Sequence, residues 1–144
     1  MNSHADLWLK QLQERGYRLT EARRTVVEIV ASSPRALTPL EVYQIAKRHH
    51  PSLGLVSVYR TLEMLNELNL VQRVHQANGC NAYLPGAEGH QHLLICERCG
   101  RAEYFQGDDL EGLFAQLGQQ YGYHIHGHWL QIYGLCPQCR SAGD

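Results

Sequence analysis

The stretch SVYRTLEMLNELNLVQRVHQANGCNAYL, residues 57–84, changes its hydrophobic period halfway along. Apolar residues first repeat at helical spacing, which predicts a helix over 57–69. Two short strand-like runs then flank Asn78-Gly79, the strongest short hairpin signal. A helix followed by a hairpin is typical of a winged helix-turn-helix, whose last helix enters the DNA major groove beside the wing. A plain helical bundle with a trailing hairpin fits the same order equally well.

Three more helices are predicted upstream. The first covers about 5–16, and the second has Thr20 as its N-cap and ends before Pro34. The third begins with a capping box of Thr38 and Glu41, with proline between them at the first helical position. These helices and the hairpin together predict a helical first domain that ends in a wing.

A Pro/Gly-rich linker, PGAEG at 85–89, separates this first domain, 1–84, from a second, 90–144. The second half reads as strands LLIC and AEYF, a helix over about 109–121 and a last strand HWLQIYGL. The predicted class is therefore α+β, a winged-helix domain followed by a small α/β unit. A unit this small often needs a metal or another staple to hold it together.

Composition narrows the classes of function. No apolar run approaches the roughly 20 residues that span a bilayer, and MNSHADLWLK lacks a signal-peptide core. We therefore expect a cytoplasmic protein with no membrane partner. Five cysteines in a reducing compartment favour metal or redox chemistry over disulfides.

Charge divides unevenly between the two halves. The net charge is −1, but up to Leu84 there are ten Lys and Arg against seven Asp and Glu. From Pro85 onward there are three against seven. A positive excess in one half is expected when only that half meets a polyanion, although uneven surface charge would give the same counts.

Two CxxC motifs, Cys96-Glu-Arg-Cys99 and Cys136-Pro-Gln-Cys139, are separated by 36 residues. Zinc favours four tetrahedral ligands, and a CxxC turn presents two thiolates to one ion. Both motifs end predicted strands, so adjacent strands would bring them together as one structural Zn²⁺ site. Redox CxxC chemistry usually uses a single motif at a helix N-terminus. A base deaminase is excluded because that class of enzyme has a proline directly before its CxxC motif, whereas here the proline lies inside the second motif.

Histidines are frequent, nine in all, and five lie in the acidic half. His90 and His92 alternate, so on a strand they share a face and are candidate ligands. His124 and His126 alternate likewise but read better as surface residues. Imidazoles with a carboxylate suit Zn(II), Fe(II), Mn(II) or Ni(II).

The combination of motifs resembles the ferric-uptake-regulator family of metal-dependent repressors. The resemblance rests on RLTEAR, on SVYRTLEML against the family's T-V-Y-R-x-L, on HQHLLICERCG against H-x-H-x-x-x-C-x-x-C-G, and on YGLCPQC. It covers nearly the whole chain. It implies a homodimer, not an enzyme, that binds a palindromic operator in double-stranded DNA when loaded with its sensed metal and represses uptake or homeostasis genes.

The resemblance also implies a regulatory site. The matching positions are His90, His92, Glu111 and His128, for which Zn²⁺ is the first choice and Fe²⁺ the alternative. Glu111 could instead serve only in a capping box with Asp108.

The hinge site of other family members has no counterpart here, which weakens a peroxide-sensing function. Its positions fall on residues that are not plausible ligands: Ala36, Leu84, Gln91 and Leu93. His75 and Cys80, near the turn of the hairpin, are candidates for an additional zinc site, although a lone cysteine in a hairpin is more often packed.

The helix-turn-helix predicts the DNA contacts. Tyr59 and Arg60 lie near the start of the recognition helix, where Arg can bind guanine and a Tyr ring can meet a thymine methyl. Ser57 and Thr61 are candidates for phosphate or base contacts, and Arg18 resembles a basic residue that relatives place near the minor groove. Core packing for Tyr59 and simple solvation for Arg18 are the alternatives.

Two functions of other classes fit parts of the sequence. A zinc-storage or redox-responsive zinc-binding protein would use the four cysteines without an operator. A metallohydrolase using the histidines would lack an evident general base other than Glu111.

Overall fold

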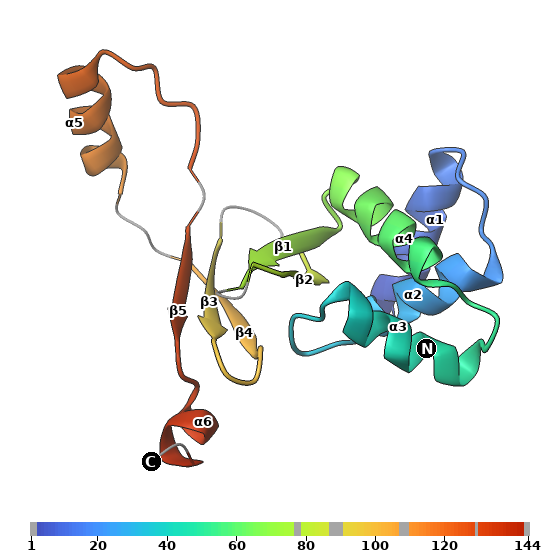
Figure 1. The fold of residues 1–144 in the computed structure, drawn as a ribbon. Helices are drawn as coiled ribbons and strands as arrows, with labels where there is room; N and C mark the ends of the chain where they lie inside the picture. The colour runs from blue at the N-terminus through green and yellow to red at the C-terminus, as the bar shows by residue number, and fades with distance from the viewer. Residues whose placement is uncertain (1–2, 77–78, 87–90, 107–109, 129, 143–144) are drawn as a thin grey trace.

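The computed structural model describes residues 3–76, 79–86, 91–106, 110–128 and 130–142. Helices and strands alternate in blocks along this part of the chain (Figure 1). The elements are α1 Ser3–Glu14, α2 Glu21–Ala31, α3 Pro39–His49, α4 Leu55–Glu67, β1 Val71–His75, β2 Asn81–Pro85, β3 His92–Cys96, β4 Ala102–Phe105, α5 Glu111–Tyr121, β5 Gln131–Gly134 and α6 Pro137–Ala142.

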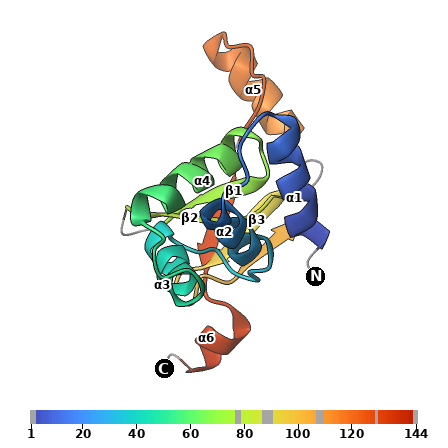
Figure 2. The ribbon, with the colours of Figure 1, turned by 90° about the vertical axis from the view of Figure 1, so that its right-hand side faces the viewer.

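Helices α1 to α4 pack around one apolar core (Figure 2). The predicted caps set two of the helix starts. Thr20 accepts a hydrogen bond from the Arg23 N–H at 3.2 Å. The capping box is also confirmed: Thr38 Oγ1 accepts from the Glu41 N–H at 3.1 Å, and the Glu41 carboxylate accepts from the Thr38 N–H at 3.0 Å.

The predicted hairpin is confirmed as antiparallel strands β1 and β2, paired from Val71 opposite Pro85 to His75 opposite Asn81. Gly79 adopts φ +85°, the left-handed region that a tight turn needs, while Asn78 lies outside the described residues. The hairpin contributes Val71 and Tyr83 to the helical core. It also contributes to a second apolar cluster, shared with the sheet that follows: Ala36, Val74, Ala82, Leu84, Leu93 and Ile95. The wing therefore lies between the helices and the second sheet.

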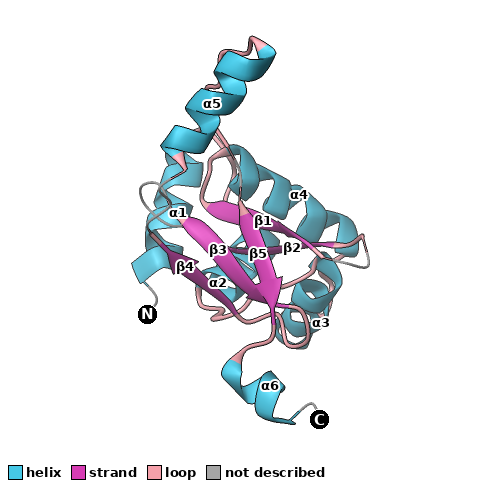
Figure 3. Ribbon diagram, turned by 90° about the vertical axis from the view of Figure 1, so that its left-hand side faces the viewer, coloured by secondary structure: helices cyan, strands magenta, loops and turns pink. Residues whose placement is uncertain are grey.

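The second sheet has the strand order β4-β3-β5 (Figure 3). Strand β4 is antiparallel to β3, whereas β5 is parallel to it, from Leu93 opposite Gln131 to Cys96 opposite Gly134. Parallel pairing places the ends of β3 and β5 at the same edge of the sheet.

Helix α5 stands apart from the rest of the fold (Figure 1). It has no buried residue, and Leu113 and Leu117 are 49% and 38% exposed. After the helix ends at Gly122, φ +73°, the chain turns back so closely that a side chain at Gly118 would meet the Tyr123 carbonyl oxygen.

The predicted α+β class is confirmed, with three local differences. Helix α4 begins two residues earlier than predicted, and β5 is shorter than the predicted strand. The predicted strand IYGLC ends at Gly134 instead, two residues before Cys136, and Cys139 lies in α6, which was not predicted. No helix in the described ranges is long and apolar enough to cross a membrane.

Candidate metal centres and DNA-contacting face

The four cysteines of the CxxC motifs come together at one edge of the second sheet. Cys96 ends β3 and Cys99 follows in a turn, while Cys136 follows β5 and Cys139 lies in α6. Their sulfurs all lie within 4.8 Å of one another, and Cys99 Sγ is 3.7 Å from Cys136 Sγ. Two thiolates bound to one tetrahedral zinc at about 2.3 Å are roughly 3.8 Å apart. The arrangement therefore fits a four-thiolate zinc site.

The backbone around these sulfurs favours thiolates. The Cys99 N–H points at Cys96 Sγ at 3.5 Å, and the Arg101 N–H at Cys99 Sγ at 3.4 Å. Burial opposes ionisation of Cys96, but amide hydrogen bonds lower its pKa to about 6. The hydrogen bond with Cys136 raises the pKa of Cys139 to about 12. Because metal ligation needs deprotonated thiols, a divalent ion that binds here would displace the protons that these sulfurs carry.

Arginine side chains join the two motifs outside the sulfur cluster. Arg98 Nη1 donates to the Cys139 carbonyl at 2.9 Å, and Arg101 Nη1 donates to Gln138 Oε1 at 2.7 Å. These bonds hold α6 beside the turn after β3, which helps to keep the second pair of sulfurs near the first.

A second pair of ligand atoms forms at the opposite end of β3. His92 Nε2 lies 3.3 Å from His128 Nε2, and His92 is only 4% exposed. Two imidazole nitrogens on one tetrahedral zinc at about 2.05 Å would be roughly 3.3 Å apart. Phe105 packs against the His92 ring and Phe114 against the His128 ring. The pair is therefore partly shielded from water and spaced for one metal ion.

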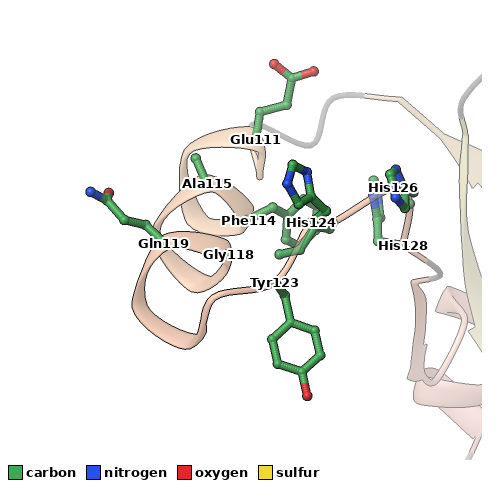
Figure 4. Close-up of a pocket in the computed structure, with 11 residues that line it drawn as sticks. Glu111, Phe114, Ala115, Gly118, Gln119, Tyr123, His124, His126 and His128 are labelled. Atoms are coloured by element: carbon green, nitrogen blue, oxygen red, sulfur yellow. The ribbon is translucent and has the colours of Figure 1, made fainter.

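Of the other two predicted ligands of this site, the structure describes only Glu111, and its carboxylate is not at the pair. Glu111 begins α5 and is exposed. In the part of the chain that the structure describes, it belongs to no group of side chains close enough to bind one metal ion with the histidines. Figure 4 shows its carboxylate directed away from His128. His90 and Asp108, the capping partner considered for Glu111, lie outside the described residues. The structure thus unites two of the four predicted ligands.

A cavity of about 610 Å³ separates α5 from the segment 123–128. Glu111, Phe114 and His128 line it, together with His124 and His126 (Figure 4). His124 and His126 are exposed, in agreement with their interpretation as surface residues. Through Phe114, α5 already contacts the His128 ring beside this cavity.

The hinge-site positions and the wing give no further cluster of metal ligands. Ala36, Leu84 and Leu93 are buried in the second apolar cluster, as their apolar character requires. Cys80 is exposed and His75 ends β1. Among the described residues, neither belongs to a group of three or more ligands, so an extra site there stays a prediction.

Helix α4 presents one exposed face near its N-terminus. Tyr59 and Arg60 are exposed there, and Ser57 is half-buried. Thr61 is only 1% exposed, and its hydroxyl donates to the Ser57 carbonyl at 2.8 Å. The prediction that Thr61 contacts DNA is therefore wrong, because the residue belongs to the buried face of the helix.

The sequence analysis missed Val56, which is 63% exposed beside Tyr59. The helical period could have identified it, because Val56 lies three residues before Tyr59 and thus on the same face. Arg18 is exposed, and its carbonyl accepts from Arg23 Nη1 at 2.6 Å.

Comparisons with known proteins point to one family. The ferric uptake regulator family matches residues 14–133. The ferric uptake regulation protein of Bacillus subtilis (strain 168) is 32% identical over 98% of this chain and 97% of its own length.

Solved structures share the fold. A zinc uptake regulator complexed with zinc and DNA matches 96% of this chain and 94% of its own, with a TM-score of 0.73 at 21% identity. The Helicobacter pylori ferric uptake regulator, described as having three functional metal binding sites, matches 96% of this chain and 92% of its own, with a TM-score of 0.70 at 21% identity.

Proposed function

This chain belongs to the ferric uptake regulator family of metal-responsive regulators, and we propose that it is a cytoplasmic, homodimeric repressor that binds a palindromic operator when a regulatory zinc ion is bound. The observation that carries the proposal is the His92–His128 pair, 3.3 Å apart and separate from the four-cysteine cluster. Two distinct donor sets allow one permanent ion and one exchangeable ion.

In this proposal the cysteine cluster holds a structural Zn²⁺, and His92 and His128 hold the regulatory ion. His90 and Glu111 are the predicted further ligands. When bound, the ion would cross-link β3, the segment before β5 and, through Glu111, helix α5. Since α5 has no buried residue, its approach to the sheet is opposed by few existing contacts. A ligand that favours one arrangement shifts the population toward it.

The exposed face of α4 supports the DNA contacts. In this proposal Arg60 binds a guanine and Tyr59 contacts a thymine methyl. Ser57 is a supporting contact to a phosphate or a base, and Arg18 lies near the minor groove. Val56 adds an exposed apolar group beside Tyr59, which suits a second thymine methyl.

Exposed apolar side chains support a second copy of the chain as partner. Leu94 and Ile132 are exposed on neighbouring strands of the second sheet, and Leu113 and Leu117 on α5. Exposed apolar side chains gathered in one region typically mark an interaction surface. They lie in the second half of the chain, residues 90–144, which we propose is the metal-binding dimerisation domain.

Iron is the alternative regulatory ion. Curated relatives from several bacteria are named ferric uptake regulation proteins, including that of Bacillus subtilis. Imidazoles with a carboxylate bind Zn²⁺ or Fe²⁺, so the donor atoms do not separate the two.

The test is a metal titration coupled to DNA binding. An operator is first selected from random duplexes with zinc-loaded protein. Protein that retains only its tightly held zinc is then titrated with Zn²⁺, or anaerobically with Fe²⁺, while fluorescence anisotropy reports operator binding. His92→Ala and His128→Ala should abolish the metal dependence but keep one tightly held zinc per subunit. His126→Ala, an exposed neighbour, is the control. Metal-dependent operator binding by the double variant His92→Ala/His128→Ala would overturn the site assignment.

A zinc-storage or redox-responsive protein is the alternative of another class. Such a protein would bind no operator, and Arg60→Ala would not change its metal binding. A repressor that reads DNA with α4 should instead lose specific binding with this substitution, which a gel-shift assay measures.

A further inference from the structure

We propose that Gln131 and Tyr133 are positioning residues that couple the regulatory metal site to the wing. The proposal rests on the function proposed above. Both residues lie on β5 and reach the edge of β1 that β2 does not pair. Gln131 Nε2 donates to the Arg73 carbonyl at 2.8 Å, and the Tyr133 hydroxyl donates to the His75 carbonyl at 2.6 Å.

Gln131 uses both ends of its amide. Besides donating to the Arg73 carbonyl, its Oε1 accepts from the His75 N–H at 3.4 Å. The Tyr133 hydroxyl is also 3.1 Å from Gln131 Oε1, but its single proton goes to the closer acceptor, His75 O. Side chains two residues apart on β5 thus bind backbone groups two residues apart on β1. Because the two spacings match, these hydrogen bonds fix the register of β1 along β5.

The same strand is attached to the regulatory site. Gln131 follows His128 by three residues and pairs with Leu93, the neighbour of His92. An ion held by both histidines would fix the start of β5 against the start of β3. Because Gln131 is the first residue of β5, any shift of the strand reaches the wing through its side chain.

The wing in turn continues from the recognition helix. Only three residues separate the end of α4 from the start of β1. The Leu70 N–H donates to the Leu65 carbonyl at 2.9 Å, and Gly86, just after β2, donates to the Leu70 carbonyl at 2.9 Å. A side chain added at Gly86 would approach the Asn69 and Leu70 carbonyl oxygens at 3.3 Å, so this junction is closely packed. Movement of β1 is therefore passed to α4.

The second apolar cluster also holds the wing against the sheet, through apolar contacts rather than hydrogen bonds. Apolar contacts are non-directional and tolerate sliding, whereas hydrogen bonds fix a register. Tyr133 is exposed enough that removing its hydroxyl leaves the cluster intact. The hydrogen bonds from Gln131 and Tyr133 can therefore be removed without dismantling the contact between wing and sheet.

The experiment compares operator affinity with and without the regulatory ion. Tyr133→Phe and Gln131→Ala are measured beside the wild type, using the selected operator and Zn²⁺ as the metal. Tyr133→Phe should lower the ratio of zinc-loaded to zinc-depleted affinity by about fivefold per subunit, the usual effect of one net hydrogen bond. Gln131→Ala removes two hydrogen bonds to β1 and should lower the ratio further. Zinc affinity of the free protein should be unchanged. Tyr121→Phe, an exposed hydroxyl of α5, is the matched control.

Two results would overturn the coupling. If Tyr133→Phe weakens operator binding equally with and without the ion, the residue has only a structural role. If the ratio is unchanged in both variants, the bonds to β1 carry no coupling. If Gln131→Ala does not fold, the result for Tyr133→Phe alone tests the coupling. A wild-type protein whose operator binding ignores the ion would refute the proposed function itself, and the coupling with it.

Discussion

The two halves of the molecule use their apolar residues in opposite ways. In α1 to α4, Leu12, Leu62 and Leu65 are at most 1% exposed and belong to one continuous core. In α5 and around β5, residues of the same kind lie on the surface: Leu113, Leu117, Ile125, Ile132 and Leu135. The first half buries most of its apolar side chains against one another, whereas the second half leaves many of its own exposed.

This difference indicates which forces stabilise the fold of each half. The helical half follows from hydrophobic burial and capping, as in any small globular domain. The second half has a sheet of three short strands with a cysteine cluster at one edge. We therefore expect a metal ion and a second copy of the chain to supply the stability that its small core does not.

The sharpest test of this comparison removes a cysteine ligand. Cys136→Ser should abolish the tightly held zinc and unfold the second half, because structural zinc contributes about 10–16 kcal/mol of apparent binding free energy in small zinc domains. Metal analysis and hydrogen exchange would measure both effects, with the helical half still protected. Cys80→Ser, which lies outside the cluster, should retain the zinc. Retention of zinc by Cys136→Ser would contradict the assignment.

The converse test opens a cavity in the helical core. Leu65→Ala should lower the free energy of unfolding by about 2–5 kcal/mol, because it removes a fully buried side chain. Urea denaturation measures this loss, and Leu40→Ala, at a half-exposed position, should change it by less than about 0.5 kcal/mol. The zinc content should be unaffected in both. If Leu65→Ala also released zinc, the two halves would not be supported independently.

The third test concerns the exposed face of α5. Leu117→Ala should leave the stability of a single chain almost unchanged but weaken the proposed dimer. Losing about 1–1.5 kcal/mol of apolar burial from each copy corresponds to roughly 30- to 150-fold in the dissociation constant. Sedimentation equilibrium measures it, with Leu7→Ala on α1 as the control. An unchanged dissociation constant would place the dimer contact elsewhere.

The smallest effect is expected at the capping box of α3. Burial opposes ionisation of Glu41, but hydrogen bonds from the Thr38 N–H and Arg35 lower its pKa below the usual 4.5. A carboxyl with a lowered pKa contributes stability above its unfolded value, and loses it as the pH falls through the folded value. Because the side chain is about one-third exposed, screening limits this to a few tenths of a kcal/mol.

Glu41→Gln should therefore reduce stability slightly at neutral pH, and the difference from the wild type should shrink as the pH falls below 4.5. Urea denaturation of the helical half at several pH values measures it, with Glu14→Gln at the exposed end of α1 as the control. A difference that grows on acidification would have the wrong sign.

Local signals in the sequence were sufficient for most of the fold. The caps at Thr20 and Thr38 and the hairpin around Gly79 were predictable because each depends on a few neighbouring residues. The convergence of the CxxC motifs was predictable as well, because each motif was expected at the end of a strand, and the second begins only two residues beyond β5. Helix α6 was missed because it is a short helix whose position depends on the arginine bonds from the other motif.

The candidate sites were harder to predict where the position of a residue depends on tertiary packing. Thr61 carries a hydroxyl suited to DNA, but it lies three residues after Val58 and four before Leu65, on the face of α4 that packs against the neighbouring helices. Glu111 has the right chemistry, yet its position depends on where α5 lies, and a helix with few contacts is poorly specified by sequence. The bonds from Gln131 and Tyr133 to β1 join segments 58 residues apart, beyond the reach of any local pattern.

The parallel strands β3 and β5 have an evolutionary consequence. Each strand has a histidine at or just before its start and a cysteine at or just beyond its end: His92 and Cys96 for β3, His128 and Cys136 for β5. Inserting or deleting one residue in either strand would reverse which way the following side chains point, and would disturb the His92–His128 pair and the cysteine cluster at once. If both groups bind ions, as proposed, we expect the length of these two strands to tolerate change less than their individual residues do.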